Sequence, residues 1–216
     1  IGVVPSADSY FKSLEIGTIG SGITGRGAAD THFMSGLIWD GASTQEYTVS
    51  SVAVGKYQIT NGIHYWATAP AGTAGNAATP QTNMMLDASG NLLVGKTASN
   101  IGVAGIEAKA NGTLVATVNG AETLFLNRLS TNGTILDCRK DGTPVGSWKS
   151  RAGVVSTIIL DPRTGGRGLS AGTNSIVPTD KDGTLSNGAT DIGEQNFKFR
   201  DAYLSGGVYL GGTGAA

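Results

Sequence analysis

The chain has 216 residues, a net charge of −1 and a charged fraction of only 14%. A chain so poor in charge lacks the electrostatic footprint that nucleic acids or anionic membranes require, and no apolar stretch approaches the ~20 residues of a membrane span. We therefore expect no nucleic-acid partner and no membrane insertion. Glycine supplies 34 residues, without the three-residue period of collagen.

The N-terminal third contains most of the aromatic side chains. Eight of the 14 aromatic residues lie in the first 66 positions, and none lies between residues 67 and 124. We therefore expect residues 1–66 to form an N-terminal β domain with a core of its own.

Residues 57–66 predict a β-hairpin, because the Asn-Gly pair at its centre tolerates the positive φ that a two-residue turn needs. That turn sets Ile59 opposite His64 and Tyr57 opposite Trp66, so these four side chains share one face. Cross-strand aromatic pairs ordinarily stabilise a sheet. The sharper hypothesis is a sugar-binding platform, with Tyr57, His64 and Trp66 as candidate glycan contacts.

Further along the chain, short apolar runs alternate with turn signatures and no helical period intervenes. Residues 67–83 are rich in Ala, Gly, Thr and Pro and predict a linker. Residues 84–160 predict a repetitive β shaft module, and residues 161–216 a C-terminal β module that continues into a tip or folding domain. The turn signatures are Ser89-Gly90-Asn91, Asn111-Gly112-Thr113, Asn132-Gly133-Thr134, Asp141-Gly142-Thr143 and Asp182-Gly183-Thr184.

The predicted strands of the shaft each present one apolar face, for example Leu114, Ala116 and Val118. One copy of such a ribbon has nothing to pack that face against, and isolated hairpins are marginal in water. Three copies around an axis would bury the faces against one another. We predict an all-β fold: an elongated fibre of short strands and tight turns, with β-prism-like or β-helix-like modules, in an intertwined parallel homotrimer. We expect the single cysteine, Cys138, to be a small buried side chain beside Leu136.

Residues 90–97 match the phosphate-binding pattern G-x-x-x-x-G-K-[ST]. A phosphate loop needs exposed backbone N–H groups within the motif and a helix that starts at the lysine. Here an apolar triplet fills the motif, and the following residues do not open a helix. We predict a turn, a short strand and a second turn. Lys96 is then structural or neutral, and its replacement by alanine should leave folding nearly unchanged.

Residues suited to catalysis are few. The sequence around His32 predicts that it is a polar loop residue rather than a base. Neither histidine is near a nucleophile-elbow sequence. The carboxylate groupings lie in turn-like sequence, where aspartate bonds its own backbone. They are Asp40 with Glu46, Asp180 with Asp182, and Asp191 with Glu194. We predict that the chain is not an enzyme and has no catalytic residues, no cofactor and no metal site.

Three stretches resemble modules of bacteriophage tail-fibre and tailspike-type proteins. They are residues 72–77 with Met85–Thr97, Leu124–Arg128 with Arg139–Ser147, and Asp191–Gly193 with Phe199–Gly214. The resemblance implies a homotrimeric, non-enzymatic tail-fibre subunit of the virion, assembled in the host cytoplasm and acting extracellularly. Its implied partners are other virion tail proteins and a host cell-surface glycan or protein.

Two alternatives remain open. The first is a tailspike that degrades a host surface polysaccharide with acids brought together at strand or subunit interfaces. The second is a minor capsid decoration protein, or a secreted bacterial adhesin with the same repeat pattern.

Overall fold

The computed structural model describes residues 11–15, 21–26, 29–39 and 44–208. Over these residues the chain is all-β, with 17 strands and no helix, as the turn signatures predict. No helix in this part of the chain has the length and apolar character needed to cross a bilayer. The chain divides into two compact units, residues 1–125 and 126–216.

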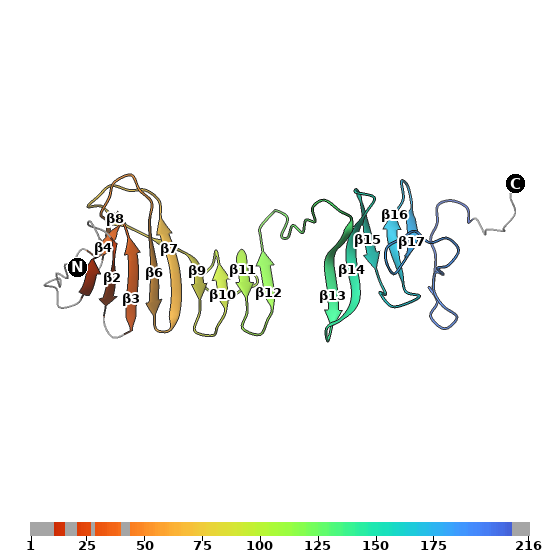
Figure 1. Cartoon of the computed structure of the whole chain (residues 1–216), viewed down its shortest axis with the longest axis horizontal. Helices are drawn as coiled ribbons and strands as arrows, with labels where there is room; N and C mark the ends of the chain where they lie inside the picture. The colour runs from red at the N-terminus through yellow and green to blue at the C-terminus, as the bar shows by residue number, and fades with distance from the viewer. Residues whose placement is uncertain (1–10, 16–20, 27–28, 40–43, 209–216) are drawn as a thin grey trace. The chain divides into compact units, whose positions relative to one another are not determined.

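The first unit is built on an antiparallel sheet of nine strands (Figure 1). Six of the eight neighbouring pairs join strands that are consecutive in the chain, so most connections are hairpins. In spatial order they are β1 (Phe11–Glu15), β2 (Ser21–Arg26), β3 (Asp30–Ser35), β6 (Val54–Thr60), β7 (Ile63–Ala69), β9 (Gln81–Leu86), β10 (Leu92–Val94), β11 (Gly105–Ala108) and β12 (Leu114–Thr117).

A small sheet packs on one face of the nine-stranded sheet. Its strands are β4 (Leu37–Trp39), β5 (Gln45–Tyr47) and β8 (Ala77–Ala78). The buried apolar cluster between the two sheets consists of Met34, Leu37, Tyr47, Val54, Ala69 and Ala78, with Trp39 packed against it. The Tyr47 hydroxyl donates a hydrogen bond to the Pro70 carbonyl oxygen at 2.9 Å, so the ring is buried with its polar atom satisfied.

The second unit contains one antiparallel sheet of five strands in sequential order (Figure 1). They are β13 (Gly133–Lys140), β14 (Thr143–Arg151), β15 (Val155–Ile159), β16 (Arg167–Ala171) and β17 (Ile176–Asp180). Cys138 lies in β13 at the edge of this sheet and is exposed. The prediction of a buried thiol is therefore wrong for the single chain, because no strand or loop among the described residues covers that part of β13.

Turn chemistry explains most of the connections. The hairpin of β6 and β7 has the predicted register, and Asn61 and Gly62 have φ values of 52° and 75°. The β13–β14 hairpin turns in the same way on Asp141 and Gly142, at 50° and 77°. Asn132-Gly133 differs, since it opens β13 and does not connect two strands.

Residues 67–83 differ from the linker that their composition predicts. They include the end of β7, all of β8 and the start of β9, and Ala67, Ala69 and Ala78 are buried. Small alanine side chains suit the narrow space between the two sheets. The division of the chain falls between residues 125 and 126 instead.

One glycine of the β10–β11 pair holds a position that no other residue type fits. Gly105 has a φ of 133°, and a Cβ built on it would lie 2.5 Å from the Val94 carbonyl oxygen. We expect Gly105→Ala to lower the free energy of unfolding of the first unit by about 2 kcal/mol more than Gly112→Ala does. Gly112 is the matched control because its φ is also positive, at 87°, yet nothing lies within 4 Å of its Cβ position. Urea denaturation measures both variants, and equal losses would contradict the steric explanation.

Candidate functional site

The structure brings together the three residues that the sequence singles out as candidate glycan contacts. Tyr57 lies on β6, and His64 and Trp66 lie on the adjacent strand β7. The ring centroids of Tyr57 and Trp66 are 5.1 Å apart, and those of His64 and Trp66 are 6.4 Å apart. The Tyr57 hydroxyl and His64 Nδ1 share a short hydrogen bond of 2.5 Å. All three side chains are half-buried, so they form a coherent patch on one face of the sheet.

A fourth aromatic ring joins this patch and was not predicted. Phe33, on β3, pairs with Tyr57, and their ring centroids are 5.7 Å apart. The side chain remains 43% exposed. Phe33 reaches Tyr57 because β3 pairs with β6. These strands are separated by β4 and β5 in the chain, so the local sequence does not predict the contact.

The aromatic patch is the centre of a longer feature, which we call the first apolar row. Direct cross-strand pairs connect one apolar residue from every strand of the nine-stranded sheet, and all of them lie on the same face. In spatial order the row is Leu14, Ile23, Phe33, Tyr57, Trp66, Met84, Val94, Ile106 and Ala116. Val94 and Ile106 are 38% and 47% exposed, so this face is not covered by the chain itself.

The opposite face of the same sheet is covered. Its central cross-strand row includes Thr24, His32, Met85, Leu93 and Glu107, each of them at most 5% exposed. The small sheet covers this face near β3, β6 and β7, and the 95–104 loop covers it near β10 and β11. The chain therefore covers one face of this sheet and leaves the face with the first apolar row exposed.

The five-stranded sheet repeats this asymmetry. Its cross-strand pairs connect a second apolar row, which consists of Leu136, Trp148, Ile158, Leu169 and Pro178. Trp148 is 55% exposed and Leu169 43%. The other face buries Ile159 and Thr179, because the turn after β17 folds back over it and Lys149 Nζ donates to the Asp182 carbonyl oxygen at 2.8 Å.

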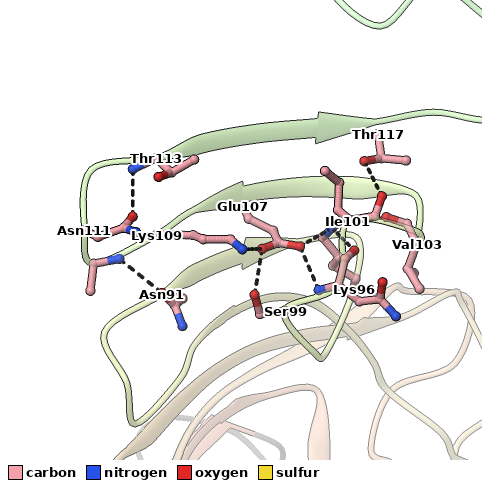
Figure 2. Close-up of polar contacts among 12 residues, drawn as sticks. Asn91, Lys96, Ser99, Ile101, Val103, Glu107, Lys109, Asn111, Thr113 and Thr117 are labelled. Atoms are coloured by element: carbon pink, nitrogen blue, oxygen red, sulfur yellow. Dashed lines mark hydrogen bonds and ion pairs between the residues drawn. The ribbon is translucent and has the colours of Figure 1, made fainter.

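The phosphate-loop match forms the predicted turn, strand and turn. Gly90 and Gly95 occupy turns with positive φ on either side of β10, and no helix follows. Lys96 is not available to a phosphate, because its ammonium pairs with Glu107 Oε1 at 2.6 Å and donates to the carbonyl oxygens of Asn100 and Val103 (Figure 2).

This ion pair is fully enclosed, with side-chain exposures of 1% for Lys96 and 0% for Glu107. Glu107 also accepts hydrogen bonds from Ser99 Oγ and from the backbone N–H of Asn100, both at 2.8 Å (Figure 2). The pair therefore fastens the 95–104 loop to the sheet. Our expectation that Lys96→Ala leaves folding nearly unchanged is wrong, because that change strands a buried carboxylate.

Of the carboxylates in the predicted groupings, Asp180 serves a turn, whereas Glu46 lies within β5 and so differs from its turn-like prediction. Asp180 Oδ1 accepts the backbone N–H groups of Asp182 and Thr184 at 2.9 Å, and the Thr184 bond lowers the pKa of Asp180 most. A general acid of a glycosidase needs a raised pKa. Asp40 lies outside the described residues. No group of three His, Cys, Asp or Glu residues within the described ranges is placed to hold a metal ion.

His32 differs from its prediction as a polar loop residue. It lies within β3, is 1% exposed, and its Nε2 is 2.8 Å from Asp30 Oδ1. Its ring also meets Trp39 edge-on, with centroids 5.3 Å apart. The alternation of β3 turns this side chain toward the covered face, which makes it part of the interior.

Comparison with known proteins adds no relative: no family model, no curated protein and no solved structure matches this chain. A proposal about its function therefore depends on the two apolar rows, the aromatic patch and the sequence itself.

The hydrogen bonds to Glu107 make the stability of the first unit depend on pH. Donation from Lys96 above all, and then from Ser99, Asn100 and Lys109, lowers the pKa of Glu107 from 4.5 to about 2. A carboxyl group with a lowered pKa stabilises the fold above its unfolded-state pKa, and this stability is lost as the pH falls through the folded-state value. We expect Glu107→Gln to be less stable than the parent chain above pH 4.5, with a gap that closes toward about pH 2.

Urea denaturation across that pH range measures the gap. Glu122→Gln is the matched control, because Glu122 is exposed in a loop and its replacement should change stability little. A gap between Glu107→Gln and the parent chain that stays constant with pH would contradict the assigned role of the ion pair.

Proposed function

We propose that this chain is a structural, non-enzymatic subunit of a bacteriophage tail fibre, and that it acts in the virion as a parallel homotrimer that contributes to attachment at the host surface. The observation that supports this most is that each of the two sheets carries an apolar row on a face that its own chain leaves open. The likeness of the turn modules to tail-fibre modules supplies the biological setting, including other virion tail proteins as partners.

The rows are unlike ordinary exposed apolar residues. Single apolar side chains are common on protein surfaces, whereas contiguous apolar patches mark interaction surfaces. The first row crosses nine strands spaced about 4.8 Å apart and so extends roughly 40 Å along the sheet. Full burial of each large side chain would contribute about 1.5–3 kcal/mol, which is enough over such a length to hold chains together.

Identical chains are the partner that best fits this geometry. Each sheet offers one open face, and its row runs in the direction in which the strands stack. Three copies placed around an axis parallel to that direction would bring the three rows together along their whole length. Rotational symmetry closes such an assembly and leaves no further copy of the face uncovered. The low charge of the chain suits this arrangement, since few charged side chains would need to be buried.

The aromatic patch has a different role in each oligomeric state. In the proposed trimer, Tyr57, His64 and Trp66 lie inside the seam, where their rings pack against those of other copies. In a monomer the same rings would form the open platform that a glycan could stack on. Oligomeric state therefore decides between the two hypotheses for these residues.

Light scattering of the full chain tests the proposal. We expect a mass three times the chain mass of 21.9 kDa. Ile106→Glu and Trp148→Glu, one in each row, should lower the measured mass, because each would bury three carboxylates in an apolar seam. A parent chain that remains folded at 21.9 kDa, or that forms a dimer, would contradict the homotrimer.

Thr113→Glu is the control for these substitutions. It adds the same charge at the exposed turn between β11 and β12, where Thr113 makes only backbone hydrogen bonds, to Asn111 Oδ1 and from the Lys109 N–H, among the described residues. Its mass should equal that of the parent chain. A loss of assembly in this variant would point to general charge repulsion in place of the rows.

The alternative of a polysaccharide-degrading tailspike predicts an activity that we do not expect. Asp87, Glu107, Asp161 and Asp180 have pKa values below their usual range, the reverse of what a general acid needs. Incubation of the assembled chain with host surface polysaccharide should release no new reducing ends. Release that disappears in Asp180→Asn or Glu194→Gln would favour the tailspike instead.

A further inference from the structure

A polar hollow of about 230 Å³ lies on the covered side of the nine-stranded sheet, beside the small sheet. Three alternate residues of β6, whose side chains share one face of the strand, form its floor. Strands β7 and β9 and the β8–β9 connection form its sides. Its lining residues are Lys56, Gln58, Thr60, Tyr65, Pro80 and Thr82. Strand alternation places this hollow on the face opposite to the first apolar row, so assembly through that row would leave it open.

The hollow holds an ammonium group that the described chain does not pair. Lys56 makes no ion pair or hydrogen bond with any residue in the described ranges. Burial lowers its pKa, and the more distant charge of Asp30 raises it in part. A half-buried cation without a direct partner is unfavourable, and an anion in the hollow would relieve this.

Asp30 makes no ion pair with Lys56, and other donors occupy its Oδ1 atom. Asp30 Oδ1 accepts a hydrogen bond from Thr60 Oγ1 at 2.8 Å, and His32 Nε2 lies 2.8 Å from the same atom. Gln58 Nε2 lies 3.4 Å from it. These contacts hold Thr60 and Gln58 in place, and no described residue accepts a hydrogen bond from the Lys56 ammonium.

The remaining groups of the hollow suit a ligand with several hydroxyls. The hydroxyls of Tyr65 and Thr82 make no hydrogen bond with the described residues, and each can both donate and accept. The Tyr65 ring and Pro80 supply apolar surface for C–H groups. The volume falls below the roughly 300–1,000 Å³ that drug-sized ligands occupy, which indicates one small ring.

We propose that this hollow binds a single carboxylate-bearing sugar residue, such as a hexuronic acid. Its carboxylate would accept hydrogen bonds from Lys56 Nζ, and its ring hydroxyls would bond to Tyr65, Thr82 and Gln58. The inference deepens the attachment role by naming its ligand class, and for its biological setting it rests on the proposed function. The binding chemistry itself depends only on the residues of the hollow.

Saturation-transfer NMR of the full chain with D-glucuronate and with D-glucose tests the site, since these sugars share a ring and differ in the carboxylate. We expect glucuronate to bind about tenfold more tightly, because a hydrogen bond to a charged group contributes more than a neutral one. Lys56→Met should reduce glucuronate binding to the level of glucose. Thr82→Val should weaken the binding of both sugars.

Lys140→Met is the matched control, because Lys140 is an exposed lysine on the β13–β14 hairpin and its loss should change neither titration. Thermal melting identifies a variant that fails to fold. If Lys56→Met fails to fold, the binding measurement on Thr82→Val replaces it as the test. The proposal is overturned if glucuronate does not bind, binds no better than glucose, or binds Lys56→Met as tightly as the parent chain.

Light scattering on the same samples separates this proposal from that of the fibre. A trimer that does not bind glucuronate would remove the sugar site alone. A monomer that binds glucuronate would remove the fibre proposal and leave the site standing.

Discussion

The constraint that organises this protein is that each antiparallel sheet has two faces, and its own chain covers only one of them. In the first unit, the small sheet and the 95–104 loop cover the face that carries His32, Leu93 and Glu107. In the second unit, the turn after β17 covers Ile159 and Thr179. Nothing in the described chain covers the other faces, and apolar rows occupy both. A surface of this kind needs a partner, and that need favours assembly with further copies of the chain.

The covered faces are held by polar as well as apolar contacts. Leu93 is fully buried beside the ion pair of Lys96 and Glu107. The carbonyl groups that accept hydrogen bonds from Lys96 belong to the 95–104 loop, and so do most of the donors to the Glu107 carboxylate. Burying two charges costs free energy, and the cost is offset only when the remaining hydrogen-bonding groups find partners. The loop backbone supplies them. A pair of this kind specifies one loop conformation more strictly than apolar packing would, because a displaced loop leaves a charge unpaired.

The division of roles between the two faces of β6 and β7 also bears on function. Tyr57 and Trp66 point to the open face, while Lys56 and Tyr65 point to the covered side. Successive side chains of a strand alternate in this way, so a single hairpin can serve assembly on one face and ligand binding on the other. This arrangement allows a fibre to keep a binding site accessible after its apolar seam has closed.

The sequence by itself determined the local structure. Asn61-Gly62 and Asp141-Gly142 predict their hairpins, and the register that sets Tyr57 against Trp66 follows from turn length alone. The failure of the phosphate-loop match was also visible, because the apolar triplet Leu92–Val94 is a strand signal. Such features depend on neighbours only a few residues apart.

Only the tertiary structure decided which surfaces are buried. Phe33 joins the aromatic patch through the pairing of β3 with β6, and residues 67–83 enter the fold through contacts with β5 and β7. The burial of Lys96 and the exposure of Cys138 likewise depend on whether a loop covers one side of a strand. Alternation of side chains along a strand indicates that its two faces differ. It does not indicate which face the rest of the chain will cover. That choice depends on long-range pairing, which the local pattern does not encode.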